Sequence, residues 1–175
     1  EYHDTEWGTP LHDDIGHFEL LTLEGAQAGL SWATVLKKRE NYRKAFKDFD
    51  PAKVARFKQR DIERLLKNEG IIRNRLKIES AVSNAGAFLE VRKEFGSFDN
   101  YIWGFVDGKP KVNSPKSFSE VPPKTELSNL ISKDLKNRGF RFVGSTIVYA
   151  YLQAAGLIND HLIVCFRYRQ LKGAK

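Results

Sequence analysis

The sequence predicts an all-α fold of about eight helices, arranged as one domain or two fused lobes. Apolar residues recur every three to four positions along much of the chain, which is the period of one helix face. The clearest series is Ile78, Ala81, Val82, Ala85, Phe88 and Leu89. Convincing alternation of apolar and polar residues, the signature of a half-buried strand, is absent. With 175 residues, 41% of them hydrophobic and twelve of them Phe, the chain is long enough to bury a sizeable core.

The first expected helices lie in the N-terminal quarter of the chain. One covers the apolar stretch around 18–23 and carries Glu24. Ser31 is a good N-cap for a second helix that runs to about Phe46. Its apolar residues are expected to face inward (Trp32, Val35, Leu36) and its basic residues to face solvent as a charged surface (Lys37, Lys38, Arg39).

Further helices follow from caps and stop signals. Asp50 and Pro51 suit the N-cap and first position of a short helix, and Gly70 ends another that begins near Arg60. The remaining helices are expected over about 78–89, 98–105, 127–138 and 146–155. A connection at 108–123 holds four of the six prolines, with several Ser and Lys, and is expected to be a loop within a single domain spanning 1–175. Residues 162–168 are a weak strand candidate.

The charge balance favours a polyanionic partner. Lys and Arg exceed Asp and Glu by seven, and the isoelectric point is about 9.5, which indicates nucleic acid or, less often, an anionic membrane surface. Mere solubility explains the same charge. No apolar run is long enough to span a bilayer. Cys165 is the only cysteine, so no internal disulfide forms, and a reducing, cytoplasmic compartment is expected.

Glu24 is the most informative single residue. It stands in a stretch that is apolar on most sides and is followed by the small residues of Gly25–Gly29 and then by Trp32. A solvated helix would place its acids on a polar stripe, and a buried charge costs several kcal/mol unless it is paired. We therefore expect Glu24 to be a buried negative charge that awaits a flat cationic ligand.

Aromatic residues near the N-terminus are candidates for the walls of that site. Tyr2, Trp7 and Trp32 present faces that suit a cation. The alternative is that each of these rings fills core volume, which is the commoner role of an aromatic side chain.

A glycine-bearing turn between two helices is the second candidate site. Residues 132–146 have the pattern of helix, tight turn and helix, and the second helix would begin near Thr146 with free N–H groups that attract phosphate. Basic residues surround the turn, namely Lys133, Lys136, Arg138 and Arg141. The alternative is that these cations offset the helix dipole and that Gly139 is a C-cap.

A weak metal pattern joins the two ends of the chain. His161 and Cys165 have a spacing that zinc ligands use, and His3 is a third ligand candidate. Four ligands are normal for structural zinc; His12 and His17 are possible fourth ligands, although both lie in a segment expected to be solvated. The chain begins at Glu1 and contains no Met, so residues upstream are expected to be missing.

Several motifs, in order, resemble the 3-methyladenine DNA glycosylase I family over nearly the whole chain. They are Tyr2-His3-Asp4-x-Glu6-Trp7-Gly8, the stretch 23–32, Lys37-Lys38-Arg39-Glu40, the stretch 70–75, Ser132-Lys133-Asp134-Leu135, Arg138-Gly139-Phe140 with Phe142-Val143-Gly144, and Asn159-Asp160-His161. The resemblance implies a helix-hairpin-helix fold and hydrolytic excision of 3-methyladenine from alkylated double-stranded DNA, with free 3-methyladenine as a product. A monomer is expected. The alternatives are a non-catalytic helix-hairpin-helix DNA-binding module with a vestigial pocket, a small-molecule binder or metal-stabilised interaction domain with incidental positive charge, and a glycosylase whose specificity is shifted towards 3-methylguanine.

The resemblance also implies roles for single residues. Glu24 would face the damaged base, Tyr2 and Trp32 would stack on it, and Trp7 would line the pocket. Residues expected at the DNA are Gly29 and Leu30 at the gap left by the extruded nucleotide, and Gly139, Val143, Gly144, Ser145 and Thr146 in the hairpin. His3, His161 and Cys165 match three ligands of the family's zinc, whose fourth, a Cys, would lie upstream of Glu1. Asp160 is expected to be a turn residue that orients His161, rather than a catalytic group.

Overall fold

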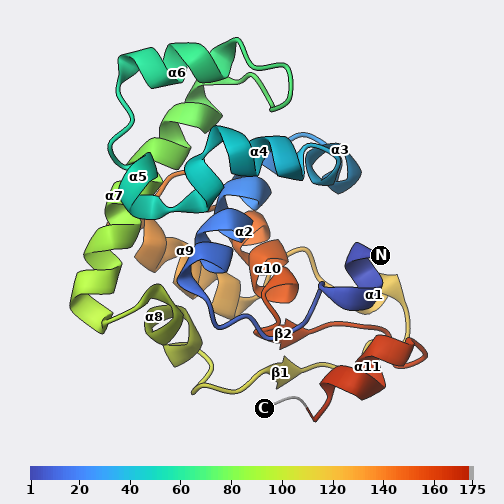
Figure 1. Ribbon diagram of the computed structural model, residues 1–175. Coiled ribbons are helices and arrows are strands. Elements are labelled where there is room, and N and C mark those ends of the chain that lie inside the picture. The colour runs from blue at the N-terminus through green and yellow to red at the C-terminus, as the bar shows by residue number, and fades with distance from the viewer. Residues whose placement is uncertain (174–175) are drawn as a thin grey trace.

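The computed structural model describes residues 1–173 and is built almost entirely from helices (Figure 1). The α-helices in this part of the chain are α1 (Tyr2–Thr5), α2 (Asp14–Gln27), α3 (Trp32–Leu36), α4 (Arg39–Ala45), α5 (Pro51–Val54), α6 (Gln59–Leu66), α7 (Arg75–Phe95), α8 (Phe98–Gly104), α9 (Glu126–Asn137), α10 (Ser145–Ala154) and α11 (Phe166–Leu171). Single turns of 3₁₀ type occur at η1 (Lys47–Phe49) and η2 (Phe118–Glu120), and the two-residue strands β1 (Lys111–Val112) and β2 (Ile158–Asn159) pair in parallel. The all-α prediction is confirmed, with more and shorter helices than the eight expected.

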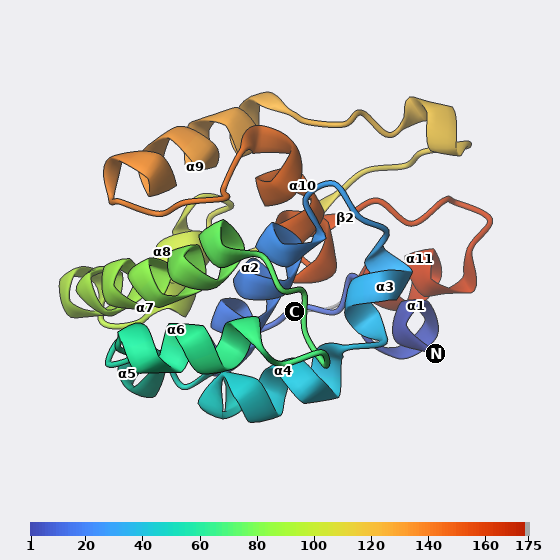
Figure 2. The same ribbon diagram turned by 90° about the horizontal axis from the view of Figure 1, so that it is seen from above.

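Helix α2 lies at the centre of the fold, with α10 beside it in both views (Figures 1 and 2). Every residue from His17 to Ala26 is buried, so this helix is enclosed on all sides, as its nearly continuous apolar sequence requires. The ring of Phe18 packs edge-on against Phe88 of α7 at 5.3 Å between centroids, and Phe88 stacks on Phe98 of α8 at 4.3 Å. The core thus joins segments from both halves of the chain.

The helix expected between Ser31 and Phe46 is divided in two. Ser31 is the N-cap, because its side chain accepts a hydrogen bond from the Thr34 N–H at 3.2 Å. The helix is interrupted at Lys37–Lys38, and α4 restarts at Arg39. The expected outward orientation of Arg39 is wrong: its side chain is only 14% exposed, because it reaches two glutamates on other elements.

Residues 162–168 do not form the strand considered from the sequence. They comprise a turn and the start of α11. The nearby strand is β2, which pairs with β1 and holds the Pro-rich connection against the C-terminal part of the chain, with Lys111 opposite Ile158 and Val112 opposite Asn159. The apolar run at 162–164 is too exposed to serve as a core strand: Val164 is 82% exposed.

The N-terminal segment packs against the C-terminal one, so that α1 and α11 lie at the same end of the molecule (Figures 1 and 2). Two glycines permit this close approach. Gly8 is buried with φ +79°, and a Cβ there would lie 2.8 Å from the His161 ring; a Cβ at Gly156, with φ +74°, would lie 2.5 Å from the Thr9 backbone. None of the described helices combines the length and the apolar character needed to cross a bilayer.

Candidate active site

A cavity of about 250 Å³ opens beside the C-terminal part of α2. Its lining consists of Tyr2, Trp7, Glu24, Gln27, Trp32, Ala150 and Gln153. Ligand pockets for larger molecules typically occupy about 300–1,000 Å³, so this one suits a single flat ring system. The four residues that the sequence nominated for base binding therefore meet in one place, although they come from α1, the turn after it, α2 and α3.

Glu24 is buried in this cavity without a partner. The residue is 4% exposed, and its carboxyl group makes no hydrogen bond or ion pair with any residue from 1 to 173. Burial raises the pKa of Glu24 from 4.5 to about 8. The carboxyl is thus mostly protonated at pH 7 in the free protein. The expectation that Glu24 carries a negative charge in the free protein is therefore wrong. Desolvation destabilises the ionised carboxylate, and no positively charged group within residues 1–173 is close enough to offset this cost.

Two hydrogen-bond donors in the same cavity are also left over. The Tyr2 hydroxyl and the Trp32 indole N–H are buried with no partner among the described residues. Burial, and after it the proximity of Glu24, raises the pKa of Tyr2, so that the hydroxyl keeps its proton. Buried polar groups are nearly always paired in native structures. Together with the unpaired Glu24, these donors indicate a pocket that binds a polar ligand.

The two rings form a wall of the cavity and do not enclose a slot. The Tyr2 and Trp32 centroids are 5.5 Å apart and their planes are tilted by 46°, which leaves no room for a third ring between them. A base in the cavity would stack on the face of this pair. Trp7 lines the cavity too and extends behind it, where its ring meets His161 edge-on at 4.5 Å.

The end of α2 is capped by a lysine from another helix. Lys77 of α7 donates hydrogen bonds from Nζ to the carbonyl oxygens of Ala26, at 2.8 Å, and Ala28, at 2.5 Å. These carbonyls have no partner within the helix, and the ammonium offsets the negative end of its dipole. The turn that follows holds Gly29, with φ +79° and open space around it, and Leu30, 41% exposed. Both predicted DNA-gap residues therefore project from the surface beside the pocket.

Helices α9 and α10 and the turn between them form the predicted hairpin. Gly139 follows the end of α9 with φ +90°, so its expected role as a helix-ending glycine is correct. Gly144 is the N-cap of α10 and no side chain caps the helix there. The first N–H groups of α10, near Ser145 and Thr146, are consequently available to an anion, whereas the side chain of Val143 is buried in the core.

Two polar side chains fix the shape of this hairpin. Asn84 of α7 accepts a hydrogen bond from the Arg141 N–H at 2.8 Å and donates one to the Arg141 carbonyl at 2.9 Å. Ser132 donates to the Val143 carbonyl at 2.6 Å. Phe142 between them has φ +55° and lies against Gly25, where an added Cβ would be 3.3 Å from that of Phe142. The hairpin thus contacts α2 one residue away from Glu24.

Of the four basic residues around the hairpin, Arg138 is already engaged. It pairs with Asp134 at 2.7 Å and Glu94 at 2.6 Å and lies over the rings of Phe95 and Tyr101. Its role is to hold the end of α9. The other three, Lys133, Lys136 and Arg141, are exposed. The wider hollow of about 430 Å³ near Arg138 offers no comparable unpaired group, since its one acid, Asp134, is bonded to Tyr101 and Arg138.

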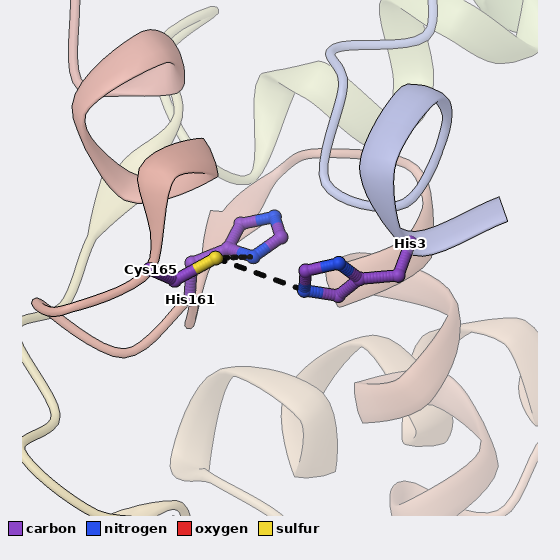
Figure 3. Close-up of side chains that lie close together, drawn as sticks. All are labelled: His3, His161 and Cys165. Carbon is purple, nitrogen blue, oxygen red and sulfur yellow. Dashed lines mark hydrogen bonds between the residues drawn. The ribbon is translucent and has the colours of Figure 1, made fainter. Parts of the chain in front are cut away.

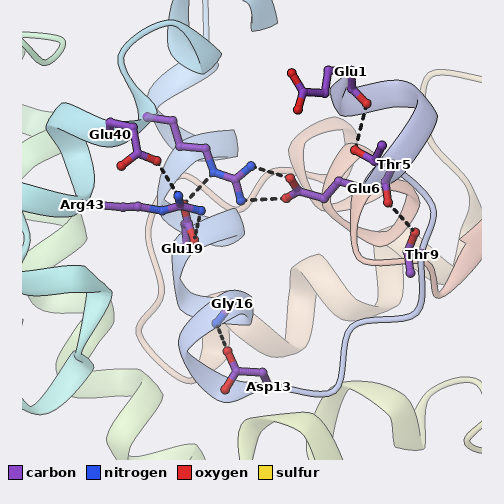
Figure 4. Close-up of polar contacts among 10 residues, drawn as sticks. Glu1, Thr5, Glu6, Thr9, Asp13, Gly16, Glu19, Glu40 and Arg43 are labelled. Atoms are coloured by element: carbon purple, nitrogen blue, oxygen red, sulfur yellow. Dashed lines mark hydrogen bonds and ion pairs between the residues drawn. The ribbon is translucent and has the colours of Figure 1, made fainter.

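A network of charged residues holds the N-terminal segment onto α2 and α4 (Figure 4). Arg39 makes two hydrogen bonds to Glu6, at 2.6 and 2.7 Å, and one to Glu19 at 2.7 Å. Arg43 adds a bond to Glu19 at 2.9 Å. Because Glu6 directly follows α1 and precedes Trp7, this network supports the cavity wall formed by Tyr2 and Trp7.

The three candidate metal ligands also meet. Cys165 Sγ is 3.8 Å from His3 Nε2 and 3.7 Å from His161 Nδ1 (Figure 3), and all three atoms lie within 4.8 Å of one another. His12 and His17 are elsewhere: both bond to Asp99. His17 is fully buried and also bonds to Tyr151 at 2.7 Å, so the expectation that it is solvated is wrong.

Asp160 has a different role from the one expected. The His161 N–H donates its hydrogen bond to Asn159 Oδ1, at 3.2 Å, and not to Asp160. Asp160 is buried and accepts hydrogen bonds from Asn113, Tyr149 and Gln153. Its carboxylate does not line the Glu24 cavity, but Gln153 does.

The residues missed from the sequence are Lys77, Asn84, Gln153 and the inward-facing Arg39. Each is a polar residue at a helical position where a solvent-facing side chain is the ordinary interpretation. The sequence offers some indication only for Arg39, because Glu6 and Arg39 both lie in motifs that resemble the glycosylase family.

The helix-hairpin-helix element beside a cavity with an unpaired buried carboxyl defines a protein of the kind that binds DNA and takes up a single extruded base. The chain belongs to the methyladenine glycosylase family, whose model matches residues 1–168. It is 50% identical over 167 residues to DNA-3-methyladenine glycosylase 1 of Escherichia coli, covering 95% of this chain and 89% of that protein. It is 51% identical over 165 residues to DNA-3-methyladenine glycosylase of Haemophilus influenzae, covering 94% and 89%.

Solved structures agree with these sequence relationships. A crystal structure of a 3-methyladenine DNA glycosylase I superposes with a TM-score of 0.92 at 52% identity, covering 94% of this chain and 91% of the other. A structure of 3-methyladenine DNA glycosylase I from Staphylococcus aureus, which concerns the recognition of 3-methyladenine by that enzyme, matches with a TM-score of 0.92 at 43% identity, covering 94% and 88%.

Proposed function

We propose that this protein is a base-excision repair enzyme that hydrolyses the N-glycosidic bond of 3-methyladenine in alkylated DNA. The observation that carries the proposal is the buried, unpartnered carboxyl of Glu24 in an aromatic cavity of about 250 Å³. A base inside a duplex is out of reach of such a cavity, so the nucleotide has to be extruded into it. The family relationship and the names of the relatives support the same reaction.

Selection of the damaged base follows from charge. Methylation at N3 makes the nucleobase cationic, and ordinary adenine is neutral. A cation on an aromatic face gains roughly 0.5–2 kcal/mol, and a charge-assisted hydrogen bond to Glu24 contributes about 1.5–3 kcal/mol. For an ionised Glu24 the sum of roughly 2–5 kcal/mol corresponds to a preference of tens to thousands of fold, and deprotonation at pH 7, one unit below a pKa of about 8, lowers this sum by about 1.4 kcal/mol.

The raised pKa of Glu24 adds a proton cycle to this selection. Because the carboxyl is mostly protonated in the free protein, binding of the cationic base displaces its proton. Cleavage of the glycosidic bond lets the base leave as a neutral molecule, and water adds to the sugar carbon and loses a proton. The carboxylate, now without a cation in a dry site, regains a proton. The charge that held the substrate is therefore gone when the product leaves.

The cationic leaving group also explains the sparse chemistry of the site. A base that departs neutral needs no strong general acid, and the cavity lining contains no Asp, Lys or His. Extrusion and holding of the nucleotide are then the main tasks. We assign the duplex to the free N-terminal end of α10, near Gly144–Thr146, and the gap in the base stack to Gly29 and Leu30.

The decisive experiment incubates the protein with alkylated DNA and identifies the released bases by chromatography. We expect 3-methyladenine as the main product. Replacement Glu24→Gln should keep the fold and slow release of 3-methyladenine from alkylated DNA by at least several-fold, because the cationic base of the substrate loses its charged partner. DNA binding without any released base would instead support the alternative of a non-catalytic helix-hairpin-helix module, and unchanged release by the Gln variant would refute the role of Glu24.

We further propose that His3, His161 and Cys165 bind Zn²⁺. Ligand atoms at roughly 2.0–2.3 Å from a tetrahedral ion lie about 3.6 Å apart, close to the 3.7 and 3.8 Å between Cys165 Sγ and the two imidazole nitrogens. The ring nitrogen of each histidine that would not bind the metal makes a hydrogen bond of its own, as is usual for metal-bound imidazoles: His161 Nε2 donates to the Trp7 carbonyl at 3.2 Å, and His3 Nδ1 bonds to Asp4 at 2.7 Å.

Such an ion would be structural, because it would tie the segment carrying Tyr2 and Trp7 to the C-terminal part of the chain. Substitution with Co²⁺ should give a thiolate-to-metal absorption band that Cys165→Ser abolishes, and metal removal should lower the melting temperature. A cobalt spectrum that is the same with and without Cys165 would count against this ligand set.

The single cysteine, which has no partner for an internal disulfide, supports a reducing, cytoplasmic environment, and we propose that the enzyme acts there as a monomer.

A further inference from the structure

Helix α10 contributes a glutamine side chain to the wall of the base cavity, and a hydrogen bond fixes the orientation of its amide group. Gln153 lines the cavity together with Glu24, and its Nε2 donates a hydrogen bond to Asp160 Oδ2 at 2.8 Å. We propose that Gln153 is a specificity-determining residue whose side-chain oxygen accepts a hydrogen bond from the extruded base, and that Asp160 is the positioning residue that fixes this orientation. This inference rests on the proposed function.

Asp160 leaves Gln153 no choice of orientation. It is 6% exposed and receives three donors: Asn113 Nδ2 on one oxygen at 2.7 Å, and both Gln153 Nε2 and the Tyr149 hydroxyl on the other. Burial, and after it the contact with Asp160, raises the pKa of Tyr149, so the hydroxyl keeps its proton and remains a donor. The Asp160 carboxylate can only accept hydrogen bonds. The Gln153 amide must therefore turn its nitrogen, and not its oxygen, towards Asp160.

The oxygen of the same amide remains for the cavity. Within residues 1–173, no group donates a hydrogen bond to Gln153 Oε1. Gln27 also lines the cavity, but none of its side-chain atoms is bonded to a described residue, so its amide can rotate to suit either kind of partner. Of the two glutamines that line the cavity, Gln153 is thus the one whose orientation is fixed before a ligand binds, with its oxygen left as an acceptor.

The amide oxygen of Gln153 on α10 is thus a fixed acceptor, in a cavity that also holds the carboxyl of Glu24 and the unpaired donors of Tyr2 and Trp32. Adenine carries an exocyclic amino group with two N–H donors, whereas guanine has a carbonyl oxygen at the same ring position. With guanine, two acceptors would face each other and both would lose their hydrogen bonds. An unpaired buried polar group of this kind commonly discriminates by about 10- to 100-fold, and a site built to bond a specific donor rejects analogues that lack it. Gln153 therefore favours 3-methyladenine over 3-methylguanine.

The test compares release of the two bases from alkylated DNA, expressed as the ratio of kcat/KM for 3-methyladenine to that for 3-methylguanine. Gln153→Met keeps the length and volume of the side chain and removes the acceptor. We expect this ratio to fall by about tenfold, mainly through loss of activity on 3-methyladenine. Asp160→Ala leaves every cavity-lining side chain in place but frees the amide, and should lower the ratio part of the way.

The matched control is Asn113→Ala, which removes a donor from the other oxygen of Asp160 and changes no group in the cavity. Its ratio should equal that of the wild type. Affinities of the free bases, measured by tryptophan fluorescence, provide the same ratio for any variant too slow to assay, and melting curves show whether each variant is folded.

An unchanged ratio in Gln153→Met, or equal ratios in Asp160→Ala and Asn113→Ala, would overturn the inference. A wild-type protein that releases no base from alkylated DNA would instead overturn the proposed function. A variant that loses activity on both bases equally would show that the residue only supports the fold, which also contradicts the assignment.

Discussion

Replacing Glu24 with Gln should stabilise the ligand-free protein progressively as pH rises. Gln has nearly the shape of a protonated Glu and cannot ionise. Burial raises the pKa of Glu24 from 4.5 to about 8, so the folded protein retains a proton that the unfolded chain has released. Stability from this group is complete below about pH 4.5 and declines as pH rises towards 8, because the unfolded state then binds fewer protons than the folded state.

The expected size of the effect follows from the two pKa values. Each pH unit between them costs the wild type about 1.4 kcal/mol, which amounts to less than about 1 kcal/mol at pH 5 and about 4 kcal/mol at pH 7.5. Above about pH 8 the cost is constant, since the carboxyl is ionised in both states. Four kcal/mol is a large share of the roughly 5–15 kcal/mol by which domains are stable. The buried amide of Gln adds an offset, but this offset does not depend on pH.

Urea denaturation followed by circular dichroism at pH 5, 6 and 7.5 measures the effect directly. With a typical slope of about 2 kcal/mol per molar urea, the difference in midpoint between Glu24→Gln and wild type should grow by roughly 1.5 M over this range. Glu69→Gln is the control, because that side chain is 86% exposed and its replacement should give a pH-independent difference. A constant difference for Glu24→Gln from pH 5 to 7.5 would refute the desolvation argument.

Three other outcomes test the DNA-binding parts of the proposal. Trp32→Ala should slow base excision by about tenfold or more, the worth of one stacked base, without changing affinity for undamaged duplex; equal losses in both would mark Trp32 as structural. Asn84→Leu removes both bonds to the Arg141 backbone and should weaken duplex binding by up to about 30-fold, at roughly 1 kcal/mol for each of the two lost bonds, with binding of free 3-methyladenine retained. Raising salt from about 50 to 200 mM should reduce affinity for undamaged duplex by at least tenfold, and a flat response would argue against phosphate contacts at the hairpin.

The burial of Glu24 was predictable because the sequence around it is apolar on most sides of a helix. Its protonation state was not, because the pKa depends on how completely Tyr2, Trp32 and their neighbours exclude water. The hairpin was likewise visible in the glycines at 139 and 144, while the role of Arg138 depended on acids that come from α7 and α9.

Side chains that join distant segments were the main source of error. Arg39 belongs to a basic triplet that normally faces solvent, and its partners Glu6 and Glu19 lie 33 and 20 residues away. Asn84 is a polar residue in a long amphipathic helix, and it acquires a role only once the turn near Arg141 packs against it, 57 residues on. Local patterns identify helices and caps, but they carry no information about which distant backbone a polar side chain will meet.

The joining of the two chain ends has a consequence for how this enzyme matures. The Trp7 carbonyl meets His161 across 154 residues, and Arg167 donates to the Thr9 hydroxyl across 158. Closing so long a loop is among the most entropically demanding steps of assembly. A ribosome-bound chain can form α2 and the Arg39–Glu6 contacts early, but the segment that carries Tyr2 and Trp7 lacks its contacts to His161 and Arg167 until those residues have been made. The base cavity therefore reaches its full support only late in synthesis.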